Sequence, residues 1–449
     1  MKKTKFIILG ATVSAFVPFT ALSAGCSKET QKEYIKSSDR ITNIVTRDTN
    51  NLELIKDSIT VTYLIDVGQL KDKALFQSGW EGLLALRDQL EANPQLKGKV
   101  KFNPVVPSAV SDFNDFYNNT FAKSDIVVIN GFTHGTTLAS FLEKYDQKTK
   151  NTPLVICSEF EIPNSPYKKL INANSKFIES SYIVGNATAE YLALKYPNNP
   201  EKRIVASFGG GNFPGVLNFN EGFVRGVYDY NLIEGNKKTV HNTLVSTPFE
   251  ATTGFATSES TFQPKIKAVM ESEGVNEGRS GRPTVVLPVA GPATGVVLEL
   301  INNLKTDQLV IGVDSDQGYA YTSNATRFAS SITKEYGQTY YDLVFDYIFK
   351  GNNKYLEDDS VTHIYNIVGS YTDGWTKFSA SRLANEEDRK LYDKALKDAQ
   401  SRFEALTKEQ KDFISSSKYY DKDGNQQNED AQLKRVEKII LAIKENANK

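Results

Sequence analysis

From residue 58 onward, short apolar runs rich in β-branched residues alternate with longer stretches of helical periodicity, and this alternation limits the possible folds most strongly. The runs predict strands at 58–66, 125–131, 152–159, 203–210, 284–291 and 308–316. Helices are expected at 73–93, 132–142, 181–195, 218–231 and 334–349. The predicted strands are apolar throughout, which is typical of parallel strands covered on both faces by helices. We therefore expect an α/β protein with doubly wound sheets.

Bulk composition excludes several classes of function. A chain of 449 residues is too long for one compact domain, and its net charge of -1 gives no basic field for nucleic acid. The two cysteines, Cys26 and Cys157, cannot form a disulfide framework. His134, His241 and His363 lie far apart in the sequence, without metal-ligand spacing. We expect no metal site, no thiol redox centre and no cofactor.

The N-terminus has the pattern of an export signal. Lys2, Lys3 and Lys5 precede an apolar stretch, and small residues then lead to Cys26. This ending resembles a bacterial lipobox, so residues 1–26 are interpreted as a lipoprotein signal peptide with lipidation at Cys26. An uncleaved anchor or a plain signal peptide with a chance cysteine are the alternatives. Residues 27–57 are polar and predict a tether, which would hold the protein on the extracellular face of the cell membrane.

The last 71 residues differ in composition from the body. Residues 379–449 are rich in Lys, Glu, Asp and Ala with helical spacing, and they predict a charged helical extension with a loop at 419–430. That loop contains DKDGNQQNED, which lacks the acidic spacing and the bidentate glutamate of a calcium loop. The extension would form a helical cover over one part of the body.

Polar residues and glycines follow several of the predicted strands. These positions include Asp66, Asn130, Gly209, Gly291 and Asp314. In open parallel sheets, ligands bind outside the carboxyl ends of the strands. Each glycine taken singly is better explained as a turn residue, but their repetition at strand ends predicts a ligand-binding crevice.

Four segments resemble the basic membrane protein (Bmp) family, the substrate-binding lipoproteins that include purine nucleoside receptors. They are LIDVGQLKDKALFQSGWEGL (64–83), FGGGNFPGVLNFNEGFVRGV (208–227), VVLPVAGPATGVV (285–297) and VIGVDSDQGY (310–319), in the family's order. The layout also resembles mycoplasma surface lipoproteins of this family. The resemblance implies a type I periplasmic-binding-protein fold over 58–378. Lobe 1 is expected at 58–165 and 312–345, and lobe 2 at 166–311 and 346–378.

The resemblance also implies a set of ligand-binding residues. By position, Asp314 and Lys334 match the family's ribose-binding aspartate and lysine. Asp66 and Asp72 match acidic positions of the first segment, where they would contact the ligand or cap a helix. Phe76, Phe132 and Phe213 are candidate aromatic contacts, and Gly291 belongs to the strand-end set. Where purine receptors carry an aspartate that binds the base edge, this chain has Thr136.

The resemblance implies the binding component of an ABC importer, with a nucleoside held in the crevice and buried by closure of the lobes. The permease would be a separate protein, and so would the ATPase, because no Gly-x-x-x-x-Gly-Lys motif occurs in the chain. Alternatives are a sugar-binding lipoprotein of the same fold and a surface adhesin that binds no solute. A nucleoside hydrolase or phosphorylase is disfavoured, because no Ser-His-Asp or Cys-His grouping is evident.

Overall fold

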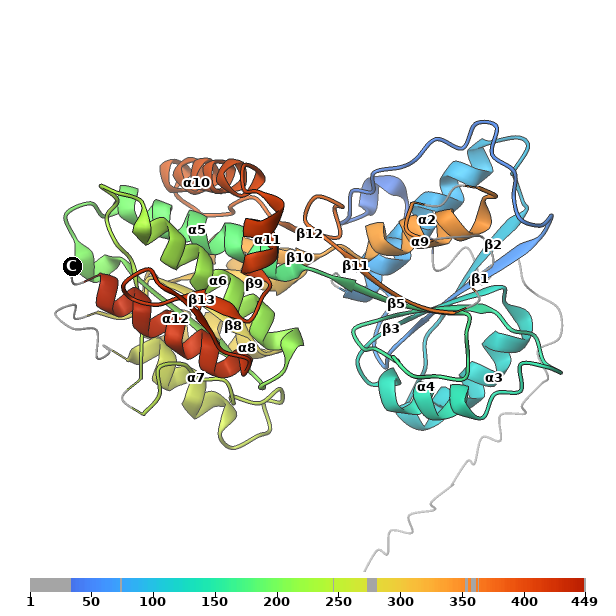
Figure 1. Cartoon of the computed structure of the whole chain (residues 1–449), viewed down its shortest axis with the longest axis horizontal. Helices are drawn as coiled ribbons and strands as arrows, with labels where there is room; N and C mark the ends of the chain where they lie inside the picture. Colours follow the sequence, from blue (N-terminus) through green and yellow to red (C-terminus); the bar gives the residue numbers. More distant parts are fainter. Residues whose placement is uncertain are drawn as a thin grey trace, which may run out of the picture. The chain divides into compact units, whose positions relative to one another are not determined.

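The computed structural model describes residues 34–72, 75–244, 246–272, 281–351, 354–356, 361 and 363–447. The expected signal peptide, the lipidation site Cys26 and residues 27–33 lie outside them. The chain divides into a small unit, residues 1–34, and a large unit, residues 35–449. Within the described residues of the large unit, two six-stranded sheets form the framework of two lobes (Figure 1).

The sheet of lobe 1 is entirely parallel, with strand order β11-β5-β4-β3-β1-β2. Its strands are β1 (Ile59–Ile65), β2 (Val100–Val105), β3 (Ile126–Asn130), β4 (Leu154–Ser158), β5 (Leu170–Ser175) and β11 (Ile364–Gly369). The central strands β3 and β4 are buried along their whole length. Their uniformly apolar sequences are therefore explained by burial on both faces.

Helices cover both faces of this sheet. On one face lie α2 (Leu75–Ala92) and α9 (Tyr336–Ile348); on the other lie α3 (Phe113–Lys123) and α4 (His134–Glu143), with η2 (Val110–Asp112) before α3 (Figure 1). The α2 side packs through the stacked rings of Tyr63 and Trp80, 6.1 Å apart. The α3 side packs Phe113, Tyr117 and Phe121 against the strands.

The sheet of lobe 2 has the order β12-β10-β9-β8-β6-β7, and only β12 runs antiparallel to its neighbour. Its strands are β6 (Ile204–Gly209), β7 (Val240–His241), β8 (Val285–Val289), β9 (Leu309–Asp314), β10 (Phe328–Lys334) and β12 (Thr376–Phe378). Short 3-10 helices, η3 (Pro200–Lys202) and η4 (Thr322–Arg327), precede β6 and β10.

Two helix pairs cover this second sheet. The pair α5 (Phe177–Lys195) and α6 (Pro214–Leu232) shares one core with the strands, and α7 (Phe262–Glu271) with α8 (Ala293–Leu304) forms the core of the opposite face. Pro214 occupies the first position of α6, where its fixed φ suits the helix and its missing N–H removes no bond. This start places Phe213 in extended backbone directly before the helix.

Three crossings join the lobes, and they correct the expected lobe boundaries. The chain leaves lobe 1 after β5, returns between β10 and α9, and leaves again between β11 and β12. Residues 166–175 and the described residues of 346–369 therefore belong to lobe 1, and 312–334 to lobe 2, contrary to expectation. The error has a physical cause: strands of both sheets are similarly apolar, and only backbone pairing decides which sheet a strand joins.

Residues 35–57 are not a free tether, which corrects the expectation for 27–57. This segment contains η1 (Ser37–Asp39) and packs on lobe 1 with Ile35 and Leu54 buried. The buried carboxylate of Glu81 accepts hydrogen bonds from the backbone N–H groups of Ile41 (3.1 and 3.0 Å) and Thr42 (2.9 Å). The Thr42 hydroxyl donates to the same carboxylate at 2.6 Å. A polar sequence is thus ordered by polar bonds.

The C-terminal extension packs against lobe 2. It consists of α10 (Glu386–Glu404), α11 (Lys408–Ile414), a hairpin of β13 (Lys418–Tyr420) and β14 (Gln426–Asn428), and α12 (Gln432–Asn446). Tyr392, Phe403 and Ile440 belong to the same core as α5 and α6. The expected helices are present, and the expected loop at 419–430 contains most of the short hairpin.

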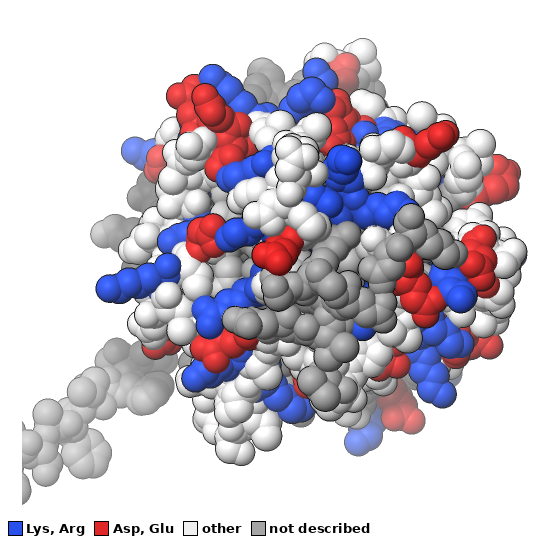
Figure 2. Space-filling view, turned by 90° about the vertical axis from the view of Figure 1, so that its left-hand side faces the viewer, with Lys and Arg blue, Asp and Glu red and all other residues white. Residues whose placement is uncertain are grey.

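Charged groups of both signs are interspersed over the face shown in Figure 2, where Lys and Arg lie beside Asp and Glu. This distribution agrees with the net charge of -1. None of the helices in the described ranges is long and apolar enough to span a bilayer.

Candidate functional site

Side chains at the strand ends of both lobes come together at one place in the structure. Glu159 directly follows β4 of lobe 1, whereas Asp314 ends β9 and Lys334 ends β10 of lobe 2. The sequence predicts Lys334 at the start of a helix; it is instead the last residue of a buried strand, and α9 begins two residues later. The lysine therefore stands immediately before a crossing between the lobes.

Lys334 bridges carboxylates from the two lobes. Its Nζ lies 3.0 and 3.2 Å from the two oxygens of Glu159 and 3.0 Å from Oδ1 of Asp314. The side chains of Lys334 and Glu159 are each 3% exposed, whereas that of Asp314 is 41% exposed. The hydroxyl of Tyr336 also donates to Glu159. Only Asp314 of these carboxylates is open to a solute.

The electrostatics of this cluster follow from burial and charge. Burial by itself lowers the pKa of the Lys334 ammonium, but the carboxylates of Asp314 and Glu159 outweigh burial and raise it above its usual value. Burial raises the pKa of the Glu159 carboxyl more than the Lys334 cation lowers it. Burial, together with Glu159, holds the pKa of Tyr336 well above its usual value. At neutral pH Lys334 is therefore a cation and Tyr336 a neutral donor.

Both carboxylates that contact Lys334 are held in left-handed backbone. Glu159 has φ +74° and Asp314 has φ +65°. Non-glycine residues seldom adopt this conformation, and such residues cluster at binding sites, where the surrounding structure enforces them. Here the left-handed conformation turns the backbone sharply after each of the two strands, so that the carboxylate reaches Lys334.

Aromatic rings line a pocket of about 650 Å³ beside the cluster. Phe132, after β3, and Phe213, before α6, contribute rings from the two lobes, and they are 53% and 41% exposed. Phe177, at the start of α5, also lines the pocket, and its ring centroid lies 4.7 Å from Nζ of Lys334. Lys334 and Tyr336 complete this wall. The pocket combines flat apolar faces with a cation and hydrogen-bonding groups.

A second hollow of about 470 Å³ is also lined by Lys334. It is lined by Asp314, Asp316, Arg382, Tyr319 and Thr42, among others. Asp316 forms an ion pair with Arg382 at 2.6 Å, which explains its place in the turn.

Two predicted acidic residues cap helices. Asp66 accepts from the backbone N–H groups of Val67 (2.7 Å) and Thr133 (3.0 Å), and from the Thr133 hydroxyl, at the start of α4. Asp72 accepts from the N–H groups of Phe76 (3.2 Å) and Gln77 (3.0 Å) in the first turn of α2. Each carboxylate satisfies N–H groups that have no partner within the helix.

The remaining predicted residues lie at the margin of the site. Phe76 is half-buried in the first turn of α2. Thr136 is exposed on α4, where it lines a separate hollow together with Phe132. Gly291 follows β8 with φ +45°, and the backbone oxygen of Phe255 lies 3.9 Å from where its side chain would begin.

Sequence reasoning missed Glu159, Tyr336 and Phe177. Glu159 stands at the end of a correctly predicted strand, so the strand-end rule alone was a usable signal. Phe177 and Tyr336 begin the helices after two crossings, and no local pattern marks a crossing. Among the described residues, no group of three or more His, Cys, Asp or Glu side chains is arranged to hold a metal ion.

Comparison with known proteins agrees with this architecture. The sequence profile described as Bmp, ABC transporter substrate-binding protein PnrA-like, matches residues 59–362. A solute-binding protein of an ABC transporter system from Aeropyrum pernix K1 superposes with a TM-score of 0.55 at 15% identity, over 86% of this chain and 99% of that one. No protein among the curated sequences matches the chain.

Two further solved structures are similar at lower scores. A transcriptional activator of the comK gene from Bacillus halodurans has a TM-score of 0.49 at 12% identity, over 77% of this chain and 98% of its own. A solute-binding protein from Conexibacter woesei DSM 14684 has a TM-score of 0.46 at 12% identity, over 78% and 99%. The type I periplasmic-binding-protein fold is therefore assigned from the strand topology and the Aeropyrum structure.

Proposed function

The chain belongs to the Bmp family of ABC transporter substrate-binding proteins, and from this premise we propose that it is the nucleoside receptor of an importer, anchored to the cell membrane by a lipid on Cys26. As a member of this family it is a binding protein and not an enzyme, so the hydrolase and phosphorylase alternative is discarded. It serves outside the cytoplasm, and the permease and ATPase are separate proteins.

The pair of exposed rings, Phe132 and Phe213, carries the nucleoside proposal. Each ring belongs to a different lobe, both line one pocket, and both keep much of their surface open. A flat base is the ligand part that such faces bind well, since base–aromatic stacking contributes about 1–3 kcal/mol per base. A purine preference is not part of the proposal, because Thr136 provides no carboxylate for a base edge.

Asp314 and Lys334 support the sugar end of the same ligand. The Asp314 carboxylate is 41% exposed, so it can accept hydrogen bonds from ribose hydroxyls beside the Lys334 cation. Hydrogen bonds to a charged group contribute about 1.5–3 kcal/mol each. Lys334 lines both the pocket with the rings and the hollow with Asp314, so a base placed against the rings would direct its sugar past Lys334 toward this carboxylate.

The binding test uses calorimetric titration of residues 27–449 with a nucleoside panel, and ribose and common sugars as controls. We expect saturable nucleoside binding that weakens about 5- to 150-fold in Phe132→Ala and in Phe213→Ala, from the stacking energy. Asp314→Ala should abolish detectable binding or weaken it strongly. Tyr420→Ala, which removes an exposed ring from the C-terminal hairpin, is the matched control and should bind as the parent does.

The other outcomes distinguish the alternatives. Binding of sugars alone would replace the proposal with a sugar receptor. Absence of any solute binding, after removal of co-purified ligand, would favour a surface protein without a transport role. Lipidation is tested separately by mass spectrometry of the full chain expressed in a bacterium: Cys26→Ser should remove the acyl mass and release the protein from membranes.

A further inference from the structure

The C-terminal extension reaches the ligand pocket, although it lies beyond the residues that match the family profile. Ser415, which follows α11, lines the pocket beside Phe213, Asn218 and Lys176. Lys176 also forms an ion pair with Asp412 of α11, at 3.9 Å. One margin of the pocket is thus built by residues outside the match at 59–362.

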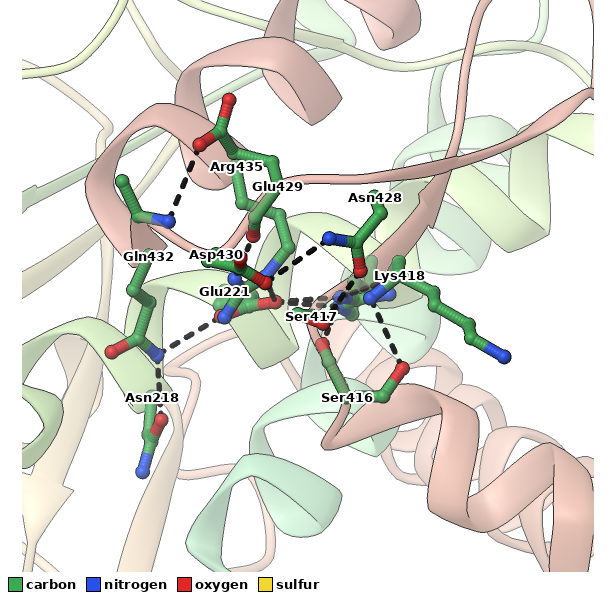
Figure 3. A network of polar contacts seen from close by, with 12 residues as sticks. Asn218, Glu221, Ser416, Ser417, Lys418, Asn428, Glu429, Asp430, Gln432 and Arg435 are labelled. Carbon is green, nitrogen blue, oxygen red and sulfur yellow. Dashed lines mark hydrogen bonds and ion pairs between the residues drawn. The ribbon is translucent and has the colours of Figure 1, made fainter.

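A buried charge network fixes this margin in place (Figure 3). Glu221 of α6 is fully buried and forms ion pairs with Arg225 (2.6 Å) and with Arg435 of α12 (2.6 Å). Arg225 also donates to the backbone oxygens of Ser416 (3.1 Å) and Lys418 (2.6 Å), which lie one and three residues after Ser415. The two arginines therefore join both α12 and the segment after α11 to the helix that carries the pocket wall.

The same network sets the orientation of Asn218. Nε2 of Gln432 donates to Oε2 of Glu221 (2.9 Å) and to Oδ1 of Asn218 (2.6 Å). A carboxylate paired with arginines only accepts hydrogen bonds, so Gln432 must present its NH₂ group to Glu221 and Asn218. Asn218 must then turn its own oxygen toward Gln432. Its Nδ2 points away from Gln432, as Figure 3 shows.

Asn218 lies in the second turn of α6, after Phe213 at the start of that helix, and both line the pocket. Within the described part of the chain, no residue accepts a hydrogen bond from Asn218 Nδ2. A base stacked on Phe213 would have its edge beside α6. The amide is thus a donor whose direction is fixed before any ligand binds.

We infer that the C-terminal extension determines ligand selectivity: through Gln432 it holds Asn218 as a hydrogen-bond donor for an acceptor atom of the ligand. The acceptor is a carbonyl oxygen or an unprotonated ring nitrogen of the base. This inference rests on the proposed nucleoside function. Asn218 is the contacting residue, and Gln432 of the extension is a positioning residue that acts through it.

The test compares adenosine and guanosine with their 3-deaza and 7-deaza analogues, in which a C–H group replaces an unprotonated ring nitrogen. It also compares guanosine and uridine with analogues that lack a base carbonyl. Calorimetry on residues 27–449 should show at least one parent binding about 2- to 12-fold more tightly than its analogue, from one neutral hydrogen bond. Asn218→Leu should remove this ratio. Gln432→Leu should reduce it, since the freed amide can rotate.

The double variant Asn218→Leu/Gln432→Leu should behave like Asn218→Leu alone, because Gln432 acts through Asn218. Gln427→Leu is the matched control: the side chain of this exposed glutamine of β14 donates to Asp421, outside the network, and its loss should leave the ratio unchanged. Thermal unfolding confirms that each variant is folded.

Two results would overturn the inference while the receptor function stands. One is a parent-to-analogue ratio unaffected by Asn218→Leu. The other is a loss of affinity in Gln432→Leu that is equal for all ligands and persists in the Asn218→Leu background. A parent chain that binds no nucleoside would instead overturn the proposed function and this inference together.

Discussion

Removing the charge of Lys334 should destabilise the protein strongly, because it would leave a buried carboxylate without its cation. The side chain of Glu159 is 3% exposed, and its two oxygens lie 3.0 and 3.2 Å from Nζ of Lys334. Breaking one partner of a buried ion pair costs about 3–5 kcal/mol. We therefore expect Lys334→Met to lower the free energy of unfolding by about that amount.

A second substitution separates the effect of the unpaired charge from the effect of lost packing. Lys334→Met/Glu159→Gln removes both charges, and Gln can still accept from the Tyr336 hydroxyl. Replacing a buried pair by uncharged groups is often neutral or stabilising. The double variant should therefore recover most of the stability that the single variant loses, although Asp314 stays charged, because that carboxylate is 41% exposed to solvent.

Urea unfolding of residues 27–449, followed by the fluorescence of the buried Trp80 and Trp375, measures these differences. Lys377→Met is the matched control, since Lys377 lies on the adjacent strand and its pair with Glu335, at 3.6 Å, is partly exposed. It should cost about 0–1 kcal/mol. A loss below about 1 kcal/mol in Lys334→Met, or a double variant no more stable than the single one, would refute the argument.

Three further perturbations test other parts of the fold. Glu221→Leu should lower the free energy of unfolding, measured in urea, by about 3–5 kcal/mol, because it leaves Arg225 and Arg435 buried without a carboxylate. A protease should then cut the extension sooner. The control Glu386→Gln, in an exposed pair with Lys390, should change neither the stability nor the rate of cleavage. Gly82→Ala should lower the free energy of unfolding by at least about 1–3 kcal/mol, because the new Cβ would overlap the backbone oxygen of Gly337 where α2 meets α9. The control Gly295→Ala, whose Cβ would meet its nearest neighbouring atom at 3.4 Å, should leave the stability in thermal or urea unfolding unchanged or raise it by up to about 1 kcal/mol. Burial lowers the pKa of His241 to about 4, so on acidification the unfolded chain binds the proton first. The free energy of unfolding should therefore fall as the pH is lowered from about 6.5 to 4, by up to roughly 1.4 kcal/mol per pH unit. His241→Gln should flatten this part of the profile of stability against pH, and an unchanged slope would contradict the assignment.

Six strands were predictable from sequence, whereas the edge strands and the interior strands β5 and β10 were not. Apolar runs predicted β1, β3, β4, β6, β8 and β9. The missed strand β10 reads FASSITK, and its serines are buried without any apolar signal. The Ser330 hydroxyl donates to the backbone oxygen of Ser379, so this strand is stabilised partly by polar bonds from a distant segment. Hydrophobic periodicity does not detect such a strand.

The residues that gather at the candidate site were predicted in part, for a related reason. Asp314, Lys334, Phe132 and Phe213 were identified from motifs and strand ends, and the structure brings all four to one region. Motifs did not identify Glu159, the most buried carboxylate there, because its role depends on Lys334, 175 residues later in the chain. Asp66 and Asp72 matched the same motif equally well, yet each caps a helix. Sequence position alone did not separate residues that gather at the candidate site from residues that cap a helix.

The placement of Lys334 connects ligand binding with the joining of the lobes. Its ion pair with Glu159 links lobe 2 to lobe 1, and the chain crosses between the lobes immediately after it. Lys334 contacts Oδ1 of Asp314, which is buried, so the exposed part of this carboxylate is its other oxygen. A solute hydroxyl bound there would share the carboxylate with the lysine that also pairs with Glu159 of the other lobe. If such a solute favours one arrangement of the lobes, linkage requires that the Lys334–Glu159 pair in turn alter the affinity for the solute.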